Sequence, residues 1–283
     1  MTRLFVNRLT VIDFSYLDPH RGLLGESWLV DVELEGGLDA QGMVLDFAEV
    51  KRQVKQSLDQ HFDHKLLVPN ANPGLKLTQQ GEMLELQFTL DNGRFIHHRS
   101  PTDAICLIDA LRIDSEAVTQ AIEATLTPLM PTNVKRLGIH LYPEPCDGAC
   151  YQYSHGLQQH AGNCQRIAHG HRSPIQILRN GQRDATLEQE WAARWRDIFI
   201  CSRSYVQGEN VEDGVRYLQI AYQAAQGPFE LQLPASCCYL IDTDSTVENL
   251  AQHIAETLKA EHPSEHFLVR AYEGVGKGAI GEA

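Results

Sequence analysis

Residues 151–171 have the sequence YQYSHGLQQHAGNCQRIAHGH, which contains three histidines at the spacing of a metal site. His169 and His171 are two residues apart, so an extended strand would place both imidazoles on the same face. His155 ends the preceding strand-like run, and antiparallel pairing would bring the three rings together. Three imidazoles with an open fourth position are the ligand set of a catalytic zinc site. The sequence therefore predicts that His155, His169 and His171 bind Zn2+, with His160 as a further candidate.

A cysteine lies between the first predicted ligand and the other two. A thiolate beside a dication has a lowered pKa, so Cys164 would act as a base or nucleophile near neutral pH. Alternatively, Cys164 is a fourth metal ligand and the site is structural and closed. The spacing of the residues leaves both interpretations open.

Outward from this stretch, the same order of elements occurs twice along the chain. In the first half, alternating residues predict strands at 4–13, 27–34, 83–90, 94–98 and 134–142, with amphipathic helices at 44–58 and 114–126. In the second half, strands are expected at 151–154, 174–179, 215–222, 229–233 and 267–272, with helices at 186–196 and 246–259. Asn92-Gly93 is a hairpin signal, and 67–73 is expected to be a polar turn. The pattern predicts two β-β-α-β-β-α-β modules that meet near residues 143–149.

Composition places limits on the partners of the protein. A formal charge of −13 over 283 residues opposes non-specific binding to nucleic acids or membrane surfaces, which are themselves polyanions. No apolar run is long enough to span a bilayer, and no export signal is visible, so we expect a soluble, cytoplasmic protein. The seven cysteines are then expected to be reduced thiols.

The second half resembles the 6-pyruvoyl-tetrahydropterin synthase and 6-carboxytetrahydropterin synthase family in five motifs. These are the aromatic strand that ends in His155, then Cys164, then His-Gly-His at 169–171, and a TVENLA helix start at 246–251 followed by a terminal VRAYE strand at 269–273. The resemblance implies that Cys164 is catalytic and that Glu273 anchors a pterin. A carboxylate suits that role, because it accepts two hydrogen bonds from the 2-amino and ring N–H edge.

The first half carries the motif that the second half lacks. Phe62-Asp63-His64-Lys65-Leu66-Leu67 resembles the Asp-His-x-x-Leu motif of the family, which implies that Asp63 orients and charge-stabilises a proton-shuttling His64. The three histidines are missing from the first half, where Asp18, Leu24 and Glu26 stand in the compared positions. We therefore expect residues 1–145 to form a degenerate, metal-free module and residues 146–283 to form the zinc-binding module.

The resemblance implies an α+β fold of two tandem tunnelling-fold (T-fold) modules, with antiparallel sheets and helices packed on one face. In the family, the active site lies between subunits. This chain resembles a fused duplicate with one composite site, which would form either within one chain or between chains. A homo-oligomer, either a dimer or a trimer, is expected.

The implied function is a lyase that converts 7,8-dihydroneopterin triphosphate to 6-carboxy-5,6,7,8-tetrahydropterin, as in the queuosine route. The alternatives are 6-pyruvoyl-tetrahydropterin synthase activity and a non-catalytic pterin-binding protein. Lys65, Arg166 and Arg172 are candidates for binding the triphosphate, or are solvated surface charges.

Overall fold

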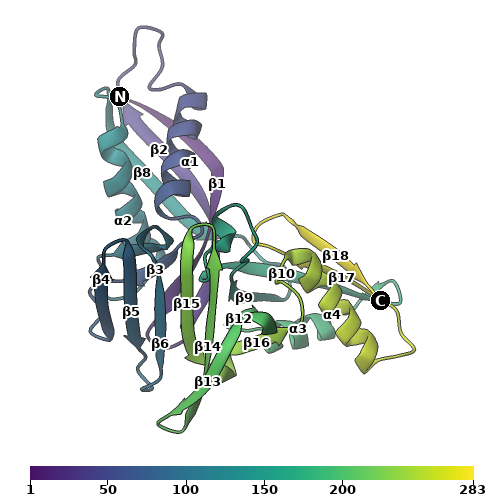
Figure 1. The fold of residues 1–283 in the computed structure, drawn as a ribbon. Helices are drawn as coiled ribbons and strands as arrows, with labels where there is room; N and C mark the ends of the chain where they lie inside the picture. Colours follow the sequence, from purple (N-terminus) through teal and green to yellow (C-terminus); the bar gives the residue numbers. More distant parts are fainter.

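A five-stranded sheet with two helices packed against it forms the first part of the chain in the computed structural model, which describes residues 1–283 (Figure 1). The strand order is β7-β3-β1-β2-β8. Leucine, valine and isoleucine side chains of the sheet and of both helices form one buried core. The elements are β1 Thr2–Asp18, β2 Gly22–Gly36, α1 Phe47–His61, β3 Leu66–Pro69, β7 Ile105–Ile108, α2 Ser115–Leu126 and β8 Val134–Pro143.

A second sheet with two helices forms the last part of the chain, on the right in Figure 1. Its order is β16-β12-β9-β10-β17-β18, with β11 paired to β10. Trp191, Trp195 and the apolar face of α4 fill the core between sheet and helices. The elements are β9 Cys150–His155, β10 His169–Arg179, β11 Gln182–Arg183, α3 Ala185–Arg194, β12 Ile198–Ser202, β16 Cys238–Ile241, α4 Val247–Glu261, β17 Phe267–Tyr272 and β18 Gly278–Glu282.

A third sheet takes three strands from each half of the chain, in the order β13-β14-β15-β6-β5-β4. The halves join where β15 pairs with β6, with Leu231 opposite His98. One face of this sheet buries a core shared by both halves. The strands are β4 Leu75–Gln80, β5 Met83–Thr89, β6 Phe95–Pro101, β13 Val206–Glu212, β14 Val215–Ala224 and β15 Gly227–Pro234. Because this sheet belongs to both halves, the division at residues 145/146 stays a prediction.

Local signals explain where several elements begin and end. The Asp46 side chain accepts the backbone N–H groups of Ala48 and Glu49 at the start of α1, and Thr246 caps α4 in the same way. Gly93, with φ of +83°, closes the hairpin between β5 and β6, as the Asn92-Gly93 signal predicts. The helices predicted at 44–58, 114–126, 186–196 and 246–259 are all present, with their ends shifted by a few residues.

The structure corrects three features of the predicted fold. The expected turn at 67–73 contains β3, whose four buried residues pair in parallel with β1 and β7. The strand expected at 174–179 begins five residues earlier, so that His169 and His171 lie on β10. No strand was predicted at 206–212, where the structure has β13, paired with β14.

The two halves meet back to back at the hairpins β1–β2 and β9–β10. Ser15 Oγ donates a hydrogen bond to Ser154 Oγ at 2.7 Å. A Cβ atom on Gly170 would lie 2.6 Å from Gly25 Cα, and a Cβ on Gly25 would collide with the backbone of Tyr153. Glycine is therefore required at both positions by the close approach of the two halves.

His98, on β6 in the shared core, is 1% exposed, and its Nδ1 has no hydrogen-bond partner. Burial lowers the pKa of His98 to about 3, whereas in the unfolded chain it is about 6.5. As the pH falls below about 6.5, His98 is protonated in the unfolded chain while it stays neutral in the folded protein. The free energy of unfolding is therefore highest above pH 6.5 and falls as the pH decreases towards 3.

The pH dependence of unfolding should report this buried imidazole. Between pH 7.5 and 4.5, we expect wild type to lose about 2 to 3 kcal/mol more unfolding free energy than His98→Leu. Urea denaturation at several pH values measures the difference. The exposed His140→Leu variant is the control and should follow wild type; parallel curves for wild type and His98→Leu would contradict the account.

Candidate metal centre and catalytic cluster

Antiparallel pairing of β9 and β10 brings the three predicted histidine ligands together. His155 lies opposite His169, and His171 lies opposite Tyr153 on the same face of the pair. All three imidazoles are fully buried, and their candidate ligand atoms lie within 4.8 Å of one another. The strand spacing therefore produces the chelating arrangement that the sequence predicts.

Each histidine is oriented by a group on its Nδ1 side. His155 Nδ1 lies 3.0 Å from both the carbonyl and the hydroxyl oxygen of Ser245, and His169 Nδ1 lies 3.0 Å from the Arg166 carbonyl. His171 Nδ1 faces Asp13 Oδ1 at 3.2 Å. Such contacts select the tautomer whose Nε2 lone pair is free to bind a metal.

The residues fit a divalent metal ion. The Nε2 atoms of all three histidines are buried without a hydrogen-bond partner, which is costly unless another group binds them. Burial lowers the pKa of His155 and His169 well below the usual value, so the rings are neutral, as metal ligands must be. Three nitrogen donors with room for a fourth ligand are typical of catalytic zinc.

Asp13, on β1, is a site residue that sequence reasoning missed. Its carboxylate is 4% exposed, accepts a hydrogen bond from Ser27 Oγ at 2.5 Å and lies 3.4 Å from Lys277 Nζ. Burial would raise the pKa of Asp13, but His171 and Lys277 outweigh it and hold the pKa well below its usual range. A single aspartate within a strand gives no sequence signal of this contact, which joins the two halves.

The Asp63-His64 pair follows α1 and lies beside the three histidines. Asp63 Oδ2 is 2.6 Å from His64 Nδ1, while Asp63 Oδ1 accepts the backbone N–H of Asp13 at 2.8 Å. The His64 N–H in turn donates to the Asp13 carbonyl at 2.6 Å. These bonds hold His64 at φ of +55°, a strained backbone conformation for a residue other than glycine. The pair is therefore fixed by β1.

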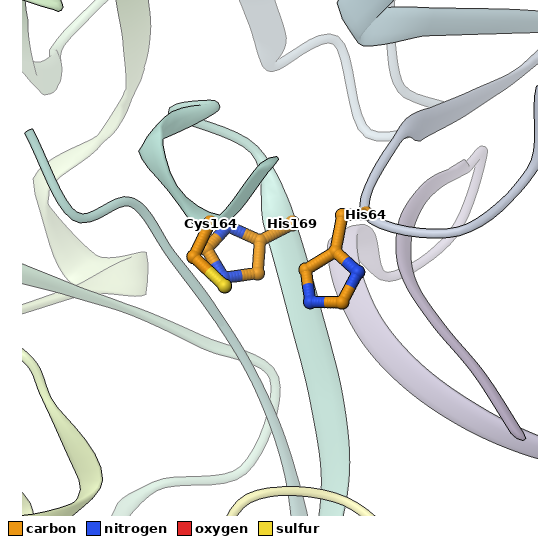
Figure 2. Close-up of side chains that lie close together, drawn as sticks. All are labelled: His64, Cys164 and His169. Carbon is orange, nitrogen blue, oxygen red and sulfur yellow. The ribbon is translucent and has the colours of Figure 1, made fainter. Parts of the chain in front are cut away.

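Cys164 lies in a short 3-10 turn, Asn163–Gln165, facing His64 and His169 (Figure 2). The candidate ligand atoms of Cys164, His64 and His169 lie within 4.8 Å of one another, but neither His155 nor His171 belongs to that group. Burial would lower the pKa of His64, but hydrogen bonds with Asp63 and Cys164 outweigh it and raise the pKa to about 10. A positively charged imidazole ring therefore lies beside the Cys164 sulfur.

The cluster draws on both halves of one chain. His64 comes from the first half, its ring centre lies 5.3 Å from that of His169, and Cys164 comes from the second half. Glu273, just after β17, lies with Oε1 3.9 Å from His171 Nε2. By contrast, His160 is exposed, and its Nδ1 accepts the N–H of Gly162, so the structure does not bring it to the cluster.

Strand register corrects the comparison of the two halves. Ser15 pairs with Leu66 and Ser154 pairs with Phe199 in equivalent parallel ladders. This equivalence places Tyr16 at the position of His155, because Tyr16 lies opposite Leu24 as His155 lies opposite His169. The assignment of Asp18 to that position is wrong: its carboxylate instead accepts the backbone N–H groups of the turn at residues 20 and 21.

The counterpart of the histidine cluster, which also takes residues from both halves, contains an ion pair in place of histidines. Asp197, with φ of +56°, occupies the position equivalent to His64. Its carboxylate binds the Arg21 guanidinium through contacts of 2.9 and 2.5 Å, and Arg21 also donates to Gln152. Gln152 donates to the buried Glu26, the counterpart of His171. The metal-free first module stays a prediction, and this chemistry supports it.

Metal analysis of the purified protein should therefore give about one zinc per chain, because one three-histidine cluster is present. Inductively coupled plasma mass spectrometry measures the ratio. His169→Ala should reduce the zinc content to near zero, whereas Glu26→Gln, at the equivalent position of the first half, should leave it unchanged. A ratio near two, or zinc loss in Glu26→Gln, would contradict this assignment.

The fold and the cluster define an α+β protein of two tandem modules around one buried histidine site. The family model for 6-pyruvoyl tetrahydropterin synthase matches residues 12–152. The chain belongs to this family, and its fold is two tandem T-fold modules. We expected the stronger resemblance in the second half, but this match covers the first half and ends before His155.

A curated relative from Pyrococcus horikoshii carries the provisional name 6-carboxy-5,6,7,8-tetrahydropterin synthase. It is 21% identical over 134 residues, which are 47% of this chain and 76% of the relative. A crystal structure of 6-pyruvoyl tetrahydropterin synthase from Plasmodium vivax is 18% identical, with a TM-score of 0.41, over 50% of this chain and 90% of its own. The Plasmodium falciparum structure is 15% identical, with a TM-score of 0.39, over 50% and 97%.

No helix in the structure combines the length and the apolar character needed to cross a membrane.

Proposed function

We propose that this protein is a zinc-dependent lyase that converts 7,8-dihydroneopterin triphosphate to 6-carboxy-5,6,7,8-tetrahydropterin. The observation that carries the proposal is the meeting of Cys164 and the Asp63-His64 pair beside three histidines with free Nε2 atoms. A metal-binding protein without catalysis would need the histidines but no cysteine paired with a carboxylate-held imidazole. The family and the name of the Pyrococcus relative support the substrate class.

His155, His169 and His171 would hold the zinc ion. When bound, zinc supplies a positive charge that polarises the side-chain oxygens of the substrate and acidifies the adjacent C–H bonds. Asp13 keeps the His171 ring in place through its Nδ1 contact at 3.2 Å. The burial of all three imidazoles excludes bulk water from their side of the site.

Proton transfer is assigned to the cysteine and the Asp63-His64 pair. The Cys164 thiolate accepts a proton from the substrate side chain, and the adjacent imidazole carries protons to and from the reacting atoms. The 2.6 Å contact with Asp63 orients the His64 ring and stabilises its charged form. Glu273, which is 22% exposed beside His171, accepts the 2-amino and ring N–H groups of the pterin.

The alternative product is 6-pyruvoyl-tetrahydropterin, formed with elimination of the triphosphate. The family name and the Plasmodium structures favour this candidate, and the same cluster would serve it. Incubation of zinc-loaded protein with 7,8-dihydroneopterin triphosphate, followed by mass spectrometry, distinguishes the products. We expect the 6-carboxy product. The 6-pyruvoyl product would replace the specific reaction, and tight pterin binding without turnover would overturn the enzyme proposal.

A further inference from the structure

Two buried cations from different halves of the chain lie next to the catalytic cluster. Lys65 directly follows His64 and is 7% exposed. Arg166 follows the turn that carries Cys164 and is 6% exposed. Burial, and after it the charge of Arg166, lower the pKa of Lys65. Neither residue forms an ion pair with a carboxylate.

The contacts of Arg166 leave one end of its guanidinium free. Nε donates to Gln226 Oε1 at 3.0 Å and Nη1 donates to the His64 carbonyl at 3.3 Å, while Nη2 has no hydrogen bond. These two bonds fix the plane of the group. The nearby carboxylates do not neutralise it: Asp63 is bonded to His64, and the exposed Asp103 affects both cations only at longer range.

The Lys65 ammonium has no hydrogen bond, and its Nζ reaches solvent although the residue as a whole is 7% exposed. Two neighbouring cations with no carboxylate between them repel each other, and this repulsion is stronger where the surrounding protein excludes part of the solvent. An anion bound between the two groups would balance both charges. Phosphate oxygens suit both groups, because the guanidinium binds them in a fixed plane and the ammonium acts as a compact charge.

We propose that Lys65 and Arg166 form an anion subsite that binds the phosphate groups of the substrate beside His64. The proposal rests on the proposed function for the identity of the phosphate ester. Glu273 adjoins His171, whereas Arg166 adjoins His64 and contributes the carbonyl that orients His169. The pterin and the phosphates therefore have different members of the histidine cluster as neighbours. Arg172 does not belong to the subsite, since it donates to the Glu144 carbonyl and to Cys150 Sγ.

Lys65→Met tests the subsite without disturbing the bonds that Arg166 makes to His64. Methionine fills a similar volume without the charge, so removal of one of two neighbouring like charges should raise the midpoint of thermal unfolding. Calorimetric titration of zinc-loaded protein with inorganic phosphate should show a Kd about 10- to 100-fold higher than in wild type. Lys51→Met, on the exposed face of α1, makes the same change in net charge and should leave both values unchanged.

Kinetics separates this proposal from the assignment of the enzyme. With 7,8-dihydroneopterin triphosphate, Lys65→Met should raise KM by at least 10-fold with a small change in kcat. Unchanged phosphate affinity and KM, or no phosphate binding to wild type, would overturn the subsite. A third outcome separates the two proposals. If wild type binds phosphate but does not turn over the pterin, and Lys65→Met loses phosphate binding, the subsite is supported and the proposed function is overturned.

Discussion

Replacement of Cys164 with alanine is expected to lower kcat by about 10²- to 10⁴-fold while the zinc content stays near one per chain. The zinc content should stay the same because Cys164 is not one of the three clustered metal ligands: its sulfur lies close to His64 and His169, but is not grouped with His155 and His171. The variant removes the proton acceptor and leaves the three imidazole ligands intact. Steady-state kinetics and metal analysis on the same preparation measure both quantities.

Cys237→Ala is the control for loss of a thiol, because Cys237 lies in a turn outside the cluster. Its kcat should match wild type. Zinc loss in Cys164→Ala would show that the thiolate is a fourth ligand and that the site is closed. A kcat that is unchanged in Cys164→Ala would remove the thiol from the mechanism.

His64→Ala should lower kcat by about 10²- to 10⁴-fold, and Asp63→Asn should cause much of the same loss. An asparagine amide would donate to His64 Nδ1 instead of accepting from it, so the ring would be held in the other tautomer and would lose its charge stabilisation. The Oδ1 contact with the backbone of Asp13 is retained in asparagine, which keeps the loop in place.

Zinc content and the affinity for a pterin product should change little in either variant, because neither residue belongs to the three-histidine set. Asp59→Asn, on the exposed end of α1, is the matched control and should keep full activity. Full activity in Asp63→Asn would show that the carboxylate has no role in orienting His64.

The repeated element order and the histidine spacing were readable in the sequence because both are local. The two-residue spacing of His169 and His171 has the period of a strand, and the structure places both on β10. The amphipathic helices and the Asn92-Gly93 hairpin are likewise encoded within short windows. Their predicted positions agree with the structure within a few residues.

Features that depend on contacts between distant segments could not be predicted. Asp13 meets His171 only because the two hairpins pack against each other, and no pattern around Asp13 indicates this. The short parallel strand β3 resembles a turn until β1 and β7 pair with it. The Tyr16–His155 equivalence was missed because the β1–β2 connection is much shorter than the loop that carries Cys164. The third sheet needs the β15–β6 pairing between halves.

The central claim is that the two halves of one chain form one complete site, since His64 and Cys164 lie together without a second copy. The most direct test mixes inactive Cys164→Ala and His64→Ala chains after unfolding and refolding them together. If each site forms within one chain, the mixture should show no activity above that of the separate variants. Recovery of a substantial fraction of wild-type activity would contradict the account, because it requires Cys164 of one chain to act with His64 of another.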